Sequence, residues 1–486
     1  MTERLLPSHS SLVCTDPLYI TDEAFPTDWR VLQSYIAAFQ ANNLSLGHLP
    51  SLIQDLAYSL HAAKTDTRYL NRYIRKHYNS TNAHISKALL DQILLSALAL
   101  PDHFPEHVVP QLREKMTMFQ LTRAQLRSLV SHQLLGTIRD SVLFDSDSSL
   151  SCWYSEHPSQ PRTTHGYLAS LFHYFLQPLR PDLPEVTYEL VSVAPPSSEG
   201  YYWLFSRARI FDTPAVIFEA AHHSIRPFPH STITCTVLTC AETPTLGPDG
   251  SDEEIAHGTW PELIPFGCLF VSKPLSMHSA MLVRGLVSTC AWQGFGPKAK
   301  PFGLVEDEQV THSCLFIDQP EHTDTPISGL VDLAGDNFYR TICKAYAGFL
   351  SLRDRDIREA YVPISGPIHA GQDPLVKILA WCIAAALTGI RLRFDVDEYL
   401  SYAAEEGMNT PDSQSLNLLH NINTLVSVFP DMSVAFVWQT LSSDIARECP
   451  TGWHVSQLLI FEASQERDRR TSAISNPYSQ TTLTPA

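Results

Sequence analysis

The stretch from Gly250 to Ile264 reads GSDEEIAHGTWPELI. It sets two adjacent glutamates, Glu253 and Glu254, just after a turn-prone Pro-Asp-Gly sequence in a chain that is only 17% charged. Ser251 and Glu254 also have the spacing of a capping box, in which each side chain accepts a hydrogen bond from a free backbone N–H of the first helical turn. The stretch therefore has two interpretations: the acid and base of a glycosidase, or the start of a helix.

Length and composition limit the classes of protein. With 486 residues, 44% of them hydrophobic, we expect a packed core and two domains, or one large domain with an extension. The ten cysteines form no Cys-x-x-Cys pair, which predicts neither a disulfide framework nor a zinc site. A formal charge of −17 argues against sequence-independent binding of DNA or RNA. Because no signal pattern and no apolar stretch of about 18 residues occurs, we expect a soluble intracellular protein without membrane contact.

The order of patterns along the chain predicts the fold class. Apolar residues recur at helical spacing over residues 28 to 139, and a polar stretch over 145–164 predicts a loop or linker. Short β-prone runs later alternate with helical segments, which predicts an α/β layer structure with a largely buried mixed sheet. The tail from residue 464 is polar, and we expect it to be disordered. Strands are predicted at 186–193, 201–205, 215–219, 232–239, 269–271, 281–283, 313–317 and 390–394, and helices at 165–176, 336–350 and 375–387.

Several blocks occur in an informative order. Glu-Glu-Ile is followed by Pro-Glu-Leu-Ile at 261–264, and Lys-Ala-Tyr-Ala-Gly-Phe-Leu occupies 344–350. A glycine-containing loop at 366–373 precedes Leu-Val-Lys-Ile-Leu, and two further phrases stand upstream at 112–122 and 171–175. Across residues 105 to 400 these blocks resemble the poly(ADP-ribose) glycohydrolase family. The resemblance implies a macrodomain-like α/β core, a mixed sheet flanked by helices, over 179–463, preceded by an all-helical accessory region over 1–178.

The resemblance also implies a chemistry, hydrolysis of the ribose–ribose O-glycosidic bonds of poly(ADP-ribose). Such a reaction passes through an oxocarbenium-like state, so the leaving oxygen needs a proton and a water needs positioning. By resemblance, Glu254 is the general acid and base, and Glu253 holds neighbouring ribose hydroxyls. No metal or cofactor is implied. The implied partners are poly(ADP-ribose) or ADP-ribosylated proteins, bound by a monomer in the nucleus or cytoplasm, in a setting such as the DNA damage response.

Further binding residues follow from the same resemblance. Phe295 falls at the place of an adenine-stacking tyrosine, and Phe394 at that of a second aromatic residue; the alternative for both is core packing. Gly366 and Gly371 let backbone N–H groups approach the diphosphate, or are ordinary turn glycines. Asp252 stands at the place of a family glutamine. The predicted binding set is Asp252, Phe295, Gly366, His369, Gly371 and Phe394.

The chain departs from the family pattern beside the glutamates. The family's Gly-Gly-Gly run falls on Glu242-Thr243-Pro244, and its ribose-binding Asp and Asn fall on Cys235 and Leu238. Proline lacks an N–H and cannot adopt positive φ, which excludes a direct copy of the glycine loop in this register. Three hypotheses follow: an active, divergent glycohydrolase; a macrodomain that binds ADP-ribose without cleaving it; or a structural or interaction protein in which Ser251 and Glu254 cap a helix.

Overall fold

The chain forms two compact units. The computed structural model describes residues 3–14, 26–78, 83–113, 116–139, 150–155, 161–193, 217–219, 234–240, 252–270, 275–293, 299–306, 310–318, 330–363, 373–395 and 432–475. Unit 1 comprises Met1–Ser192 and His222–Gln319, and unit 2 comprises Val193–Ala221 and Pro320–Ala486. The predicted boundary near residue 178 therefore does not separate them: the first, mostly helical part packs with the strands that follow it as one unit.

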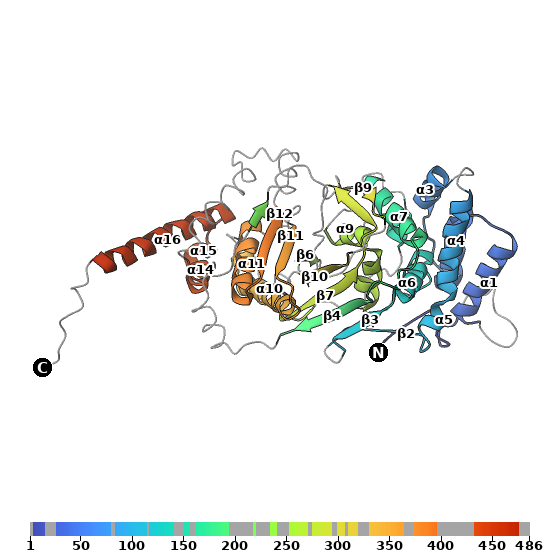
Figure 1. Ribbon diagram of the computed structural model, residues 1–486, viewed down its shortest axis with the longest axis horizontal. Helices are drawn as coiled ribbons and strands as arrows, with labels where there is room; N and C mark the ends of the chain where they lie inside the picture. The colour runs from blue at the N-terminus through green and yellow to red at the C-terminus, as the bar shows by residue number, and fades with distance from the viewer. Residues whose placement is uncertain are drawn as a thin grey trace. The chain divides into compact units, whose positions relative to one another are not determined.

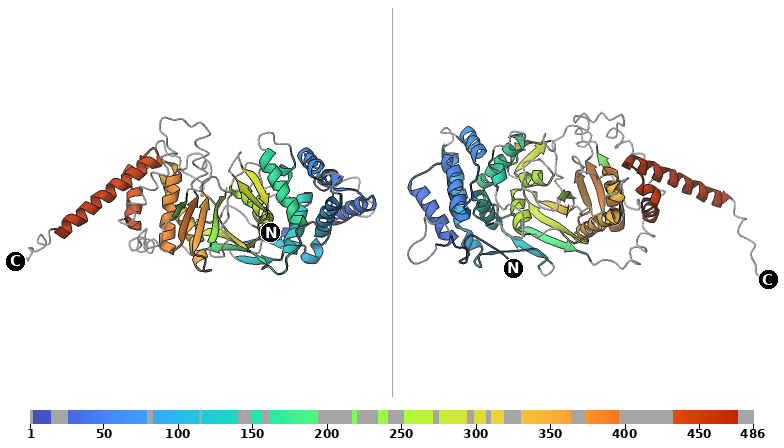
Figure 2. Two further views of the ribbon diagram at one scale, coloured as in Figure 1. Left: turned by 45° about the horizontal axis from the view of Figure 1, so that its top comes forward. Right: turned by 180° about the vertical axis from the view of Figure 1, so that it is seen from behind.

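Unit 1 opens with a helical layer (Figures 1 and 2). Local signals explain where its helices begin and end. The Thr27 hydroxyl accepts a hydrogen bond from the Arg30 N–H at the start of α1, and Thr122 forms a capping box with Gln125 at the start of α6. Gly136 ends α6 with a left-handed φ of 64°. The elements are α1 (Asp28–Ala41), η2 (Leu46–His48), α2 (Leu49–His61), α3 (Arg68–His77), α4 (Ala83–Leu98), α5 (Leu100–His103), α6 (Arg123–Leu135), η4 (Ser151–Trp153) and α7 (Pro161–Leu176).

The sequence predicted an all-helical region over 1–178, but this region also contains strands. It also contributes β1 (Glu3–Leu5), which pairs with β2 (Val108–Pro110), and β3 (Met118–Leu121), an edge strand of the sheet. Strands this short carry too little periodic signal to be distinguished from loops. Part of the predicted polar linker is also core, because Trp153 and Tyr154 are fully buried. The Trp153 ring stacks on the ring of Tyr167 of α7, and this contact packs the segment against unit 1 although its neighbours in the sequence are polar.

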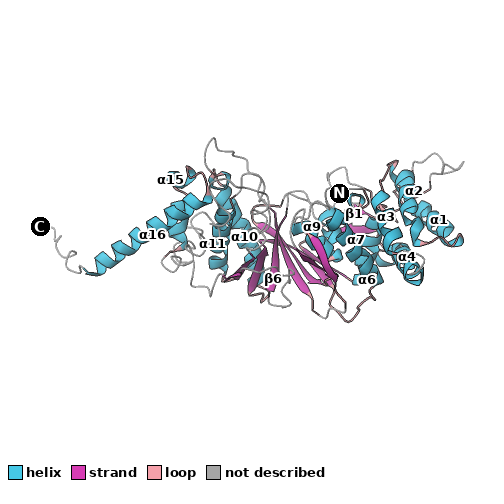
Figure 3. Cartoon of the chain, turned by 90° about the horizontal axis from the view of Figure 1, so that it is seen from above, coloured by secondary structure: helices cyan, strands magenta, loops and turns pink. Residues whose placement is uncertain are grey.

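The sheet of unit 1 has the order β3-β4-β7-β10-β6. The last pair in this order, β10 and β6, is parallel, and the other neighbours are antiparallel, so the sheet is mixed as predicted. Figure 3 shows the helices α6, α7 and α9 beside these strands. The strands are β4 (Val186–Ser192), β6 (Thr234–Cys240), β7 (Ser279–Leu286) and β10 (His312–Asp318), with a separate hairpin of β8 (Cys290–Gln293) and β9 (Lys300–Leu304).

One strand prediction was wrong. The apolar run at 269–271 was expected to be a strand, but Phe266–Phe270 forms a π-helical turn, η6. Phe266, Leu269 and Phe270 are all buried at the three- and four-residue spacing of a helix. The ring of Phe266 packs near Phe316, and that of Phe270 near Tyr188, so contacts with the sheet decide the conformation of a run whose composition is ambiguous.

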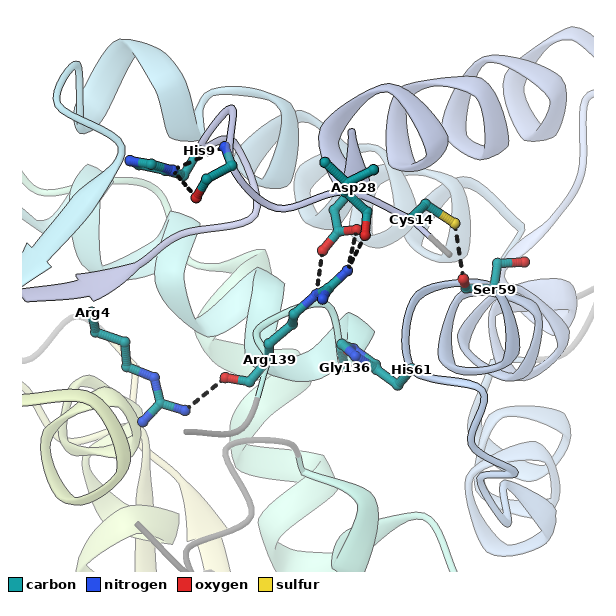
Figure 4. A network of polar contacts seen from close by, with 10 residues as sticks. Arg4, His9, Cys14, Asp28, Ser59, His61, Gly136 and Arg139 are labelled. Atoms are coloured by element: carbon teal, nitrogen blue, oxygen red, sulfur yellow. Dashed lines mark hydrogen bonds and ion pairs between the residues drawn. The ribbon is translucent and has the colours of Figure 1, made fainter. Parts of the chain in front are cut away.

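A buried ion pair secures the amino-terminal segment of unit 1 (Figure 4). The Asp28 carboxylate is fully buried and accepts two hydrogen bonds of 2.7 Å from Arg139. Arg139 also donates to the Val13 carbonyl at 2.8 Å, and its own carbonyl accepts from Arg4 at 3.0 Å. The network joins the start of α1, the first strand and the segment after α6 without relying on apolar contact.

Unit 2 combines parallel strands with two long helices. Its strands have the order β11-β12-β5, and α10 packs on α11, where the rings of Phe349 and Trp381 meet edge to face at 6.1 Å. The helices predicted at 336–350 and 375–387 and the strand at 390–394 are confirmed. The elements are β5 (Ile217–Glu219), η8 (Val331–Leu333), α10 (Asn337–Arg353), β11 (Glu359–Pro363), α11 (Pro374–Thr388), β12 (Arg391–Asp395), α14 (Val434–Leu441), α15 (Asp444–Arg447) and α16 (Gly452–Ser475).

The tail was expected to be disordered from residue 464, but α16 continues to Ser475. Its amino-terminal half is anchored because Val455, Leu459 and Ala463 are buried at four-residue spacing and the helix packs on α11 and α14. Beyond them the helix is polar, with Glu466 and Arg469 paired at 3.7 Å. Packing at one end thus propagates helix into a segment whose composition resembles a disordered tail.

Two further findings concern the described part of the chain as a whole. None of its helices is long and apolar enough to cross a membrane. The eight cysteines whose side chains the structure describes are free thiols, and six of them are buried.

Candidate functional site

Helix α9 (Asp252–Thr259) begins at the position that the sequence predicted and carries both glutamates in its first turn. Glu253 and Glu254 are 5% and 2% exposed. Acidic side chains are rarely buried to this degree unless they have a specific role or partner, whereas acids that only cap a helix usually lie in solvent. Ser251 and the side chain of Asp252 lie outside the described residues. The burial of both glutamates is therefore the main finding at this site.

The helical geometry assigns different directions to the two carboxylates. Consecutive residues of an α-helix are about 100° apart around its axis, so Glu253 and Glu254 cannot face the same atom. A nucleophile and an acid acting on the two sides of one bond would need a closer convergence. The arrangement suits one general acid and base with a neighbour that binds an adjacent hydroxyl group.

Aromatic packing sets the position of α9. The helix packs against α7, β6 and β8, and the Trp292 indole is buried between α7 and α9. Glycines make room for it on both helices: a Cβ on Gly166 would lie 2.4 Å from the Trp292 ring, and a Cβ on Gly258 would lie 2.6 Å from both Trp292 and Tyr167. Trp292 therefore holds in place the helix that carries the glutamates.

We expect Gly258→Ala to lower the free energy of unfolding by about 1–3 kcal/mol, because the added methyl group meets two buried rings that cannot move away. In an open helix the same change would be stabilising, so the contacts decide the sign. Urea unfolding checks the effect. Gly303→Ala in β9 is the matched control, since a Cβ there meets nothing within 4 Å. Equal effects of the two substitutions would contradict this view of the packing.

The third glutamate of the Gly250–Ile264 stretch, Glu262, has a structural role. It is 2% exposed in η5 (Pro261–Leu263), and its carboxylate forms an ion pair with Arg123 of α6 and accepts from the Val287 N–H at 3.2 Å. The Tyr188 hydroxyl donates to its carbonyl at 2.6 Å. Burial raises the pKa of the Glu262 carboxyl, and Arg123 opposes that shift. The Pro-Glu-Leu block therefore joins the segment after α9 to the helical layer.

The remaining predicted residues are placed as follows. Phe394 is 1% exposed in β12 of unit 2, in register with Val362 and Phe218, which is the core packing that the sequence left as the alternative. Four residues of the predicted binding set lie outside the described residues: Phe295, Gly366, His369 and Gly371.

Asp373, at the end of the predicted phosphate loop, lies close to a second acid, Asp332 of η8. Asp373 caps α11 by accepting from the Leu375 N–H at 2.9 Å, and its own N–H donates to Asp332 at 2.6 Å. Burial raises the pKa of the Asp332 carboxyl from 3.8 to about 7; the Asp373 N–H opposes this shift, the Asp373 charge adds to it, and Lys377 opposes it. Asp332 was not predicted, and its signal in the sequence, an acid in a short apolar run, is weak.

An acid whose pKa is higher in the folded state binds its proton more tightly there, so its contribution to stability falls as pH rises from 3.8 to about 7. We expect the free energy of unfolding of Asp332→Asn, relative to the native chain, to increase with pH across this window, because asparagine keeps the acceptor for the Asp373 N–H. Urea unfolding at several pH values measures this. Asp354→Asn makes the same charge change at the surface and serves as control. A difference independent of pH would overturn the expectation.

A separate groove lies in the helical layer of unit 1. It has a volume of about 1030 Å³ and lies between α1, η2, α3 and α4. Its buried residues include Phe39, Ile74 and Leu90, and its polar residues include Arg75 and Lys87. None of the predicted site residues lines it. Among the described residues, no group of three His, Cys, Asp or Glu side chains is placed to hold a metal ion.

Comparison with other proteins adds no assignment to this geometry. No known protein family and no curated protein matches this chain.

Proposed function

We propose that this chain is a divergent poly(ADP-ribose) glycohydrolase with a macrodomain-like core, in which Glu254 acts as general acid and base. One observation carries the proposal: Glu253 and Glu254 are both buried in the first turn of α9. A capping role does not require burial, and removing two carboxylates from water is costly. A site that moves a proton at a glycosidic oxygen benefits from burial of its carboxyl, because burial brings the pKa of a carboxyl closer to neutral pH.

The surrounding packing supports the same function. A catalytic carboxyl must be held within a fraction of an ångström of its working position. α9 is held at its carboxyl end by the Thr289 N–H, which donates to the Thr259 carbonyl at 2.9 Å, and by Trp260, whose indole donates to Ser288 at 3.1 Å. Buried Trp292 packs against the side of the helix.

In the proposed mechanism, protonated Glu254 donates its proton to the ribose–ribose oxygen as the glycosidic bond breaks. The carboxylate then takes a proton from the water that attacks the anomeric carbon, which restores the acid. Glu253 accepts hydrogen bonds from the hydroxyls of the neighbouring ribose and fixes the sugar. The products are free ADP-ribose and a polymer shorter by one unit.

The test is release of ADP-ribose from an automodified poly(ADP-ribose) polymerase by the full chain, with calorimetric titration of free ADP-ribose in parallel. Release supports the glycohydrolase. Binding without release would replace it by a macrodomain that recognises ADP-ribose without cleaving it, the reading that the substituted glycine run favours. If the chain neither releases nor binds ADP-ribose, Glu254 is part of a purely structural helix.

A further inference from the structure

A small cavity lies beside the buried Arg123–Glu262 pair. Its volume is about 30 Å³, close to the space that one water molecule occupies in the liquid. All the residues that line it belong to the described part of unit 1, and they come from α6, η5, the end of α7 with the segment after it, and the connection between β7 and β8. Its charged lining residues are Arg123, Arg127, Arg180 and Glu262.

The charges around this cavity do not balance. Arg123 and Arg127 are 9% and 5% exposed, yet Glu262 is the only acid that lines the cavity with them. The Glu262 carboxylate is engaged by Arg123 and by the Val287 N–H. Arg180 lies nearer the surface and is matched by Asp182, to which it donates at 3.0 and 2.8 Å. One positive charge in the interior is left without an acid of its own.

That charge belongs to Arg127. Its guanidinium donates to the backbone carbonyls of Tyr174 at 3.1 Å and Gln177 at 2.9 Å, and it lies 5.2 Å from the centre of the Tyr174 ring. The two carbonyls accept hydrogen bonds from the Arg127 guanidinium, and the ring face attracts its positive charge. Neither group carries a net negative charge. Among the described residues Arg127 forms no ion pair. A buried charge without a counter-charge costs several kcal/mol, and a bound anion removes that cost.

We propose that the cavity lined by Arg123, Arg127, Arg180 and Glu262 binds one small inorganic anion of the size of chloride. A volume this small suits a single-atom ion better than sulfate, phosphate or the phosphate groups of nucleotides. The ion completes the charge balance of two buried guanidinium groups and one carboxylate. It thereby stabilises the junction of α6, α7 and η5, and this role is independent of the proposed enzymatic activity.

Thermal unfolding of the full chain tests the site at constant ionic strength, as sodium gluconate is replaced by sodium chloride. A ligand that binds only the folded state raises Tm with its concentration. We expect Tm to rise with chloride and with bromide, and not when sulfate replaces gluconate. A Tm independent of chloride in the native chain would overturn the proposal, because the cavity would then hold a neutral water.

Two variants separate this site from general effects of salt. Arg127→Met removes the unmatched charge while keeping a long apolar side chain, and we expect it to lose the chloride dependence. Glu262→Gln removes the only carboxylate, so its Tm should rise more steeply with chloride than that of the native chain. Arg358→Met at the surface of unit 2 makes the same charge change as Arg127→Met and should respond like the native chain. Equal chloride dependence in all four proteins would refute the site.

A direct measurement on the native chain covers the case in which Arg127→Met does not fold. Chloride bound to a protein of this size broadens the ³⁵Cl resonance of the solution, and bromide competing for the same cavity should narrow it again. Broadening that bromide reverses supports the site. A ³⁵Cl linewidth equal to that of buffer alone would contradict it.

Discussion

Replacing Glu254 by glutamine should reduce the rate of ADP-ribose release by at least about 100-fold, because general acid–base catalysis contributes about 10²- to 10⁴-fold. Glutamine has the shape of glutamate but neither donates nor accepts the proton that the reaction needs. Thermal unfolding of the variant, which replaces a carboxyl that is 2% exposed, checks that the protein is folded. Release is measured on automodified polymerase under single-turnover conditions.

Two controls define what the Glu254 result means. Glu106→Gln removes an exposed carboxylate from the same unit and should leave the rate unchanged. Glu253→Gln keeps the proton donor but weakens the hold on the ribose, so it should raise KM more than it lowers kcat. Undiminished release by a folded Glu254→Gln protein would refute the assignment of Glu254, whatever the behaviour of Glu253.

Glu262→Gln is expected to lower the free energy of unfolding by about 3–5 kcal/mol at low chloride, the usual cost of removing one partner of a buried ion pair. The loss arises because Arg123, only 9% exposed, would keep its charge without a carboxylate. Glutamine retains an acceptor for the Val287 N–H, so the measurement isolates the charge. Urea unfolding of the full chain gives the value.

A double variant tests the cause. Arg123→Met combined with Glu262→Gln removes both charges, and we expect it to be more stable than Glu262→Gln alone, since apolar replacement of a buried pair is often nearly neutral. The exposed pair Arg358–Asp356, separated by 3.1 Å, is the control: Asp356→Asn should cost less than about 1 kcal/mol. A double variant as unstable as the sum of the two single variants would show that the charges do not interact.

Much of the secondary structure follows from local signals. α11 has an Asp cap, a proline in its first turn, a continuous apolar run and a left-handed Gly389 at its end, so its limits were predictable to within one residue. The strands β4, β6, β7 and β10 are rich in β-branched and apolar residues between breakers. Predictions were wrong where composition and packing disagree, at Phe266–Phe270 and in the second half of α16.

The candidate site was predictable only in part. The adjacent glutamates stand out in the sequence, and α9 begins where the turn-prone residues and the first acid predict it. The function of Glu262 was not visible, because its partner Arg123 lies 139 residues away. Nor was the role of Trp292, since the two glycines that receive its ring, Gly166 and Gly258, belong to different helices.

The amino-acid sequence by itself determined where most helices and strands begin and end, and it placed Glu253 and Glu254 together in the first turn of one helix. Spacing, caps and turn residues act within a few residues, so they can be read without the fold. Only the tertiary structure decided that both glutamates are buried, that Glu262 pairs with Arg123 and that the Arg127 guanidinium donates to backbone carbonyls instead of forming an ion pair. Burial and ion pairing depend on which faces of distant elements meet, and this is set by packing of the whole unit.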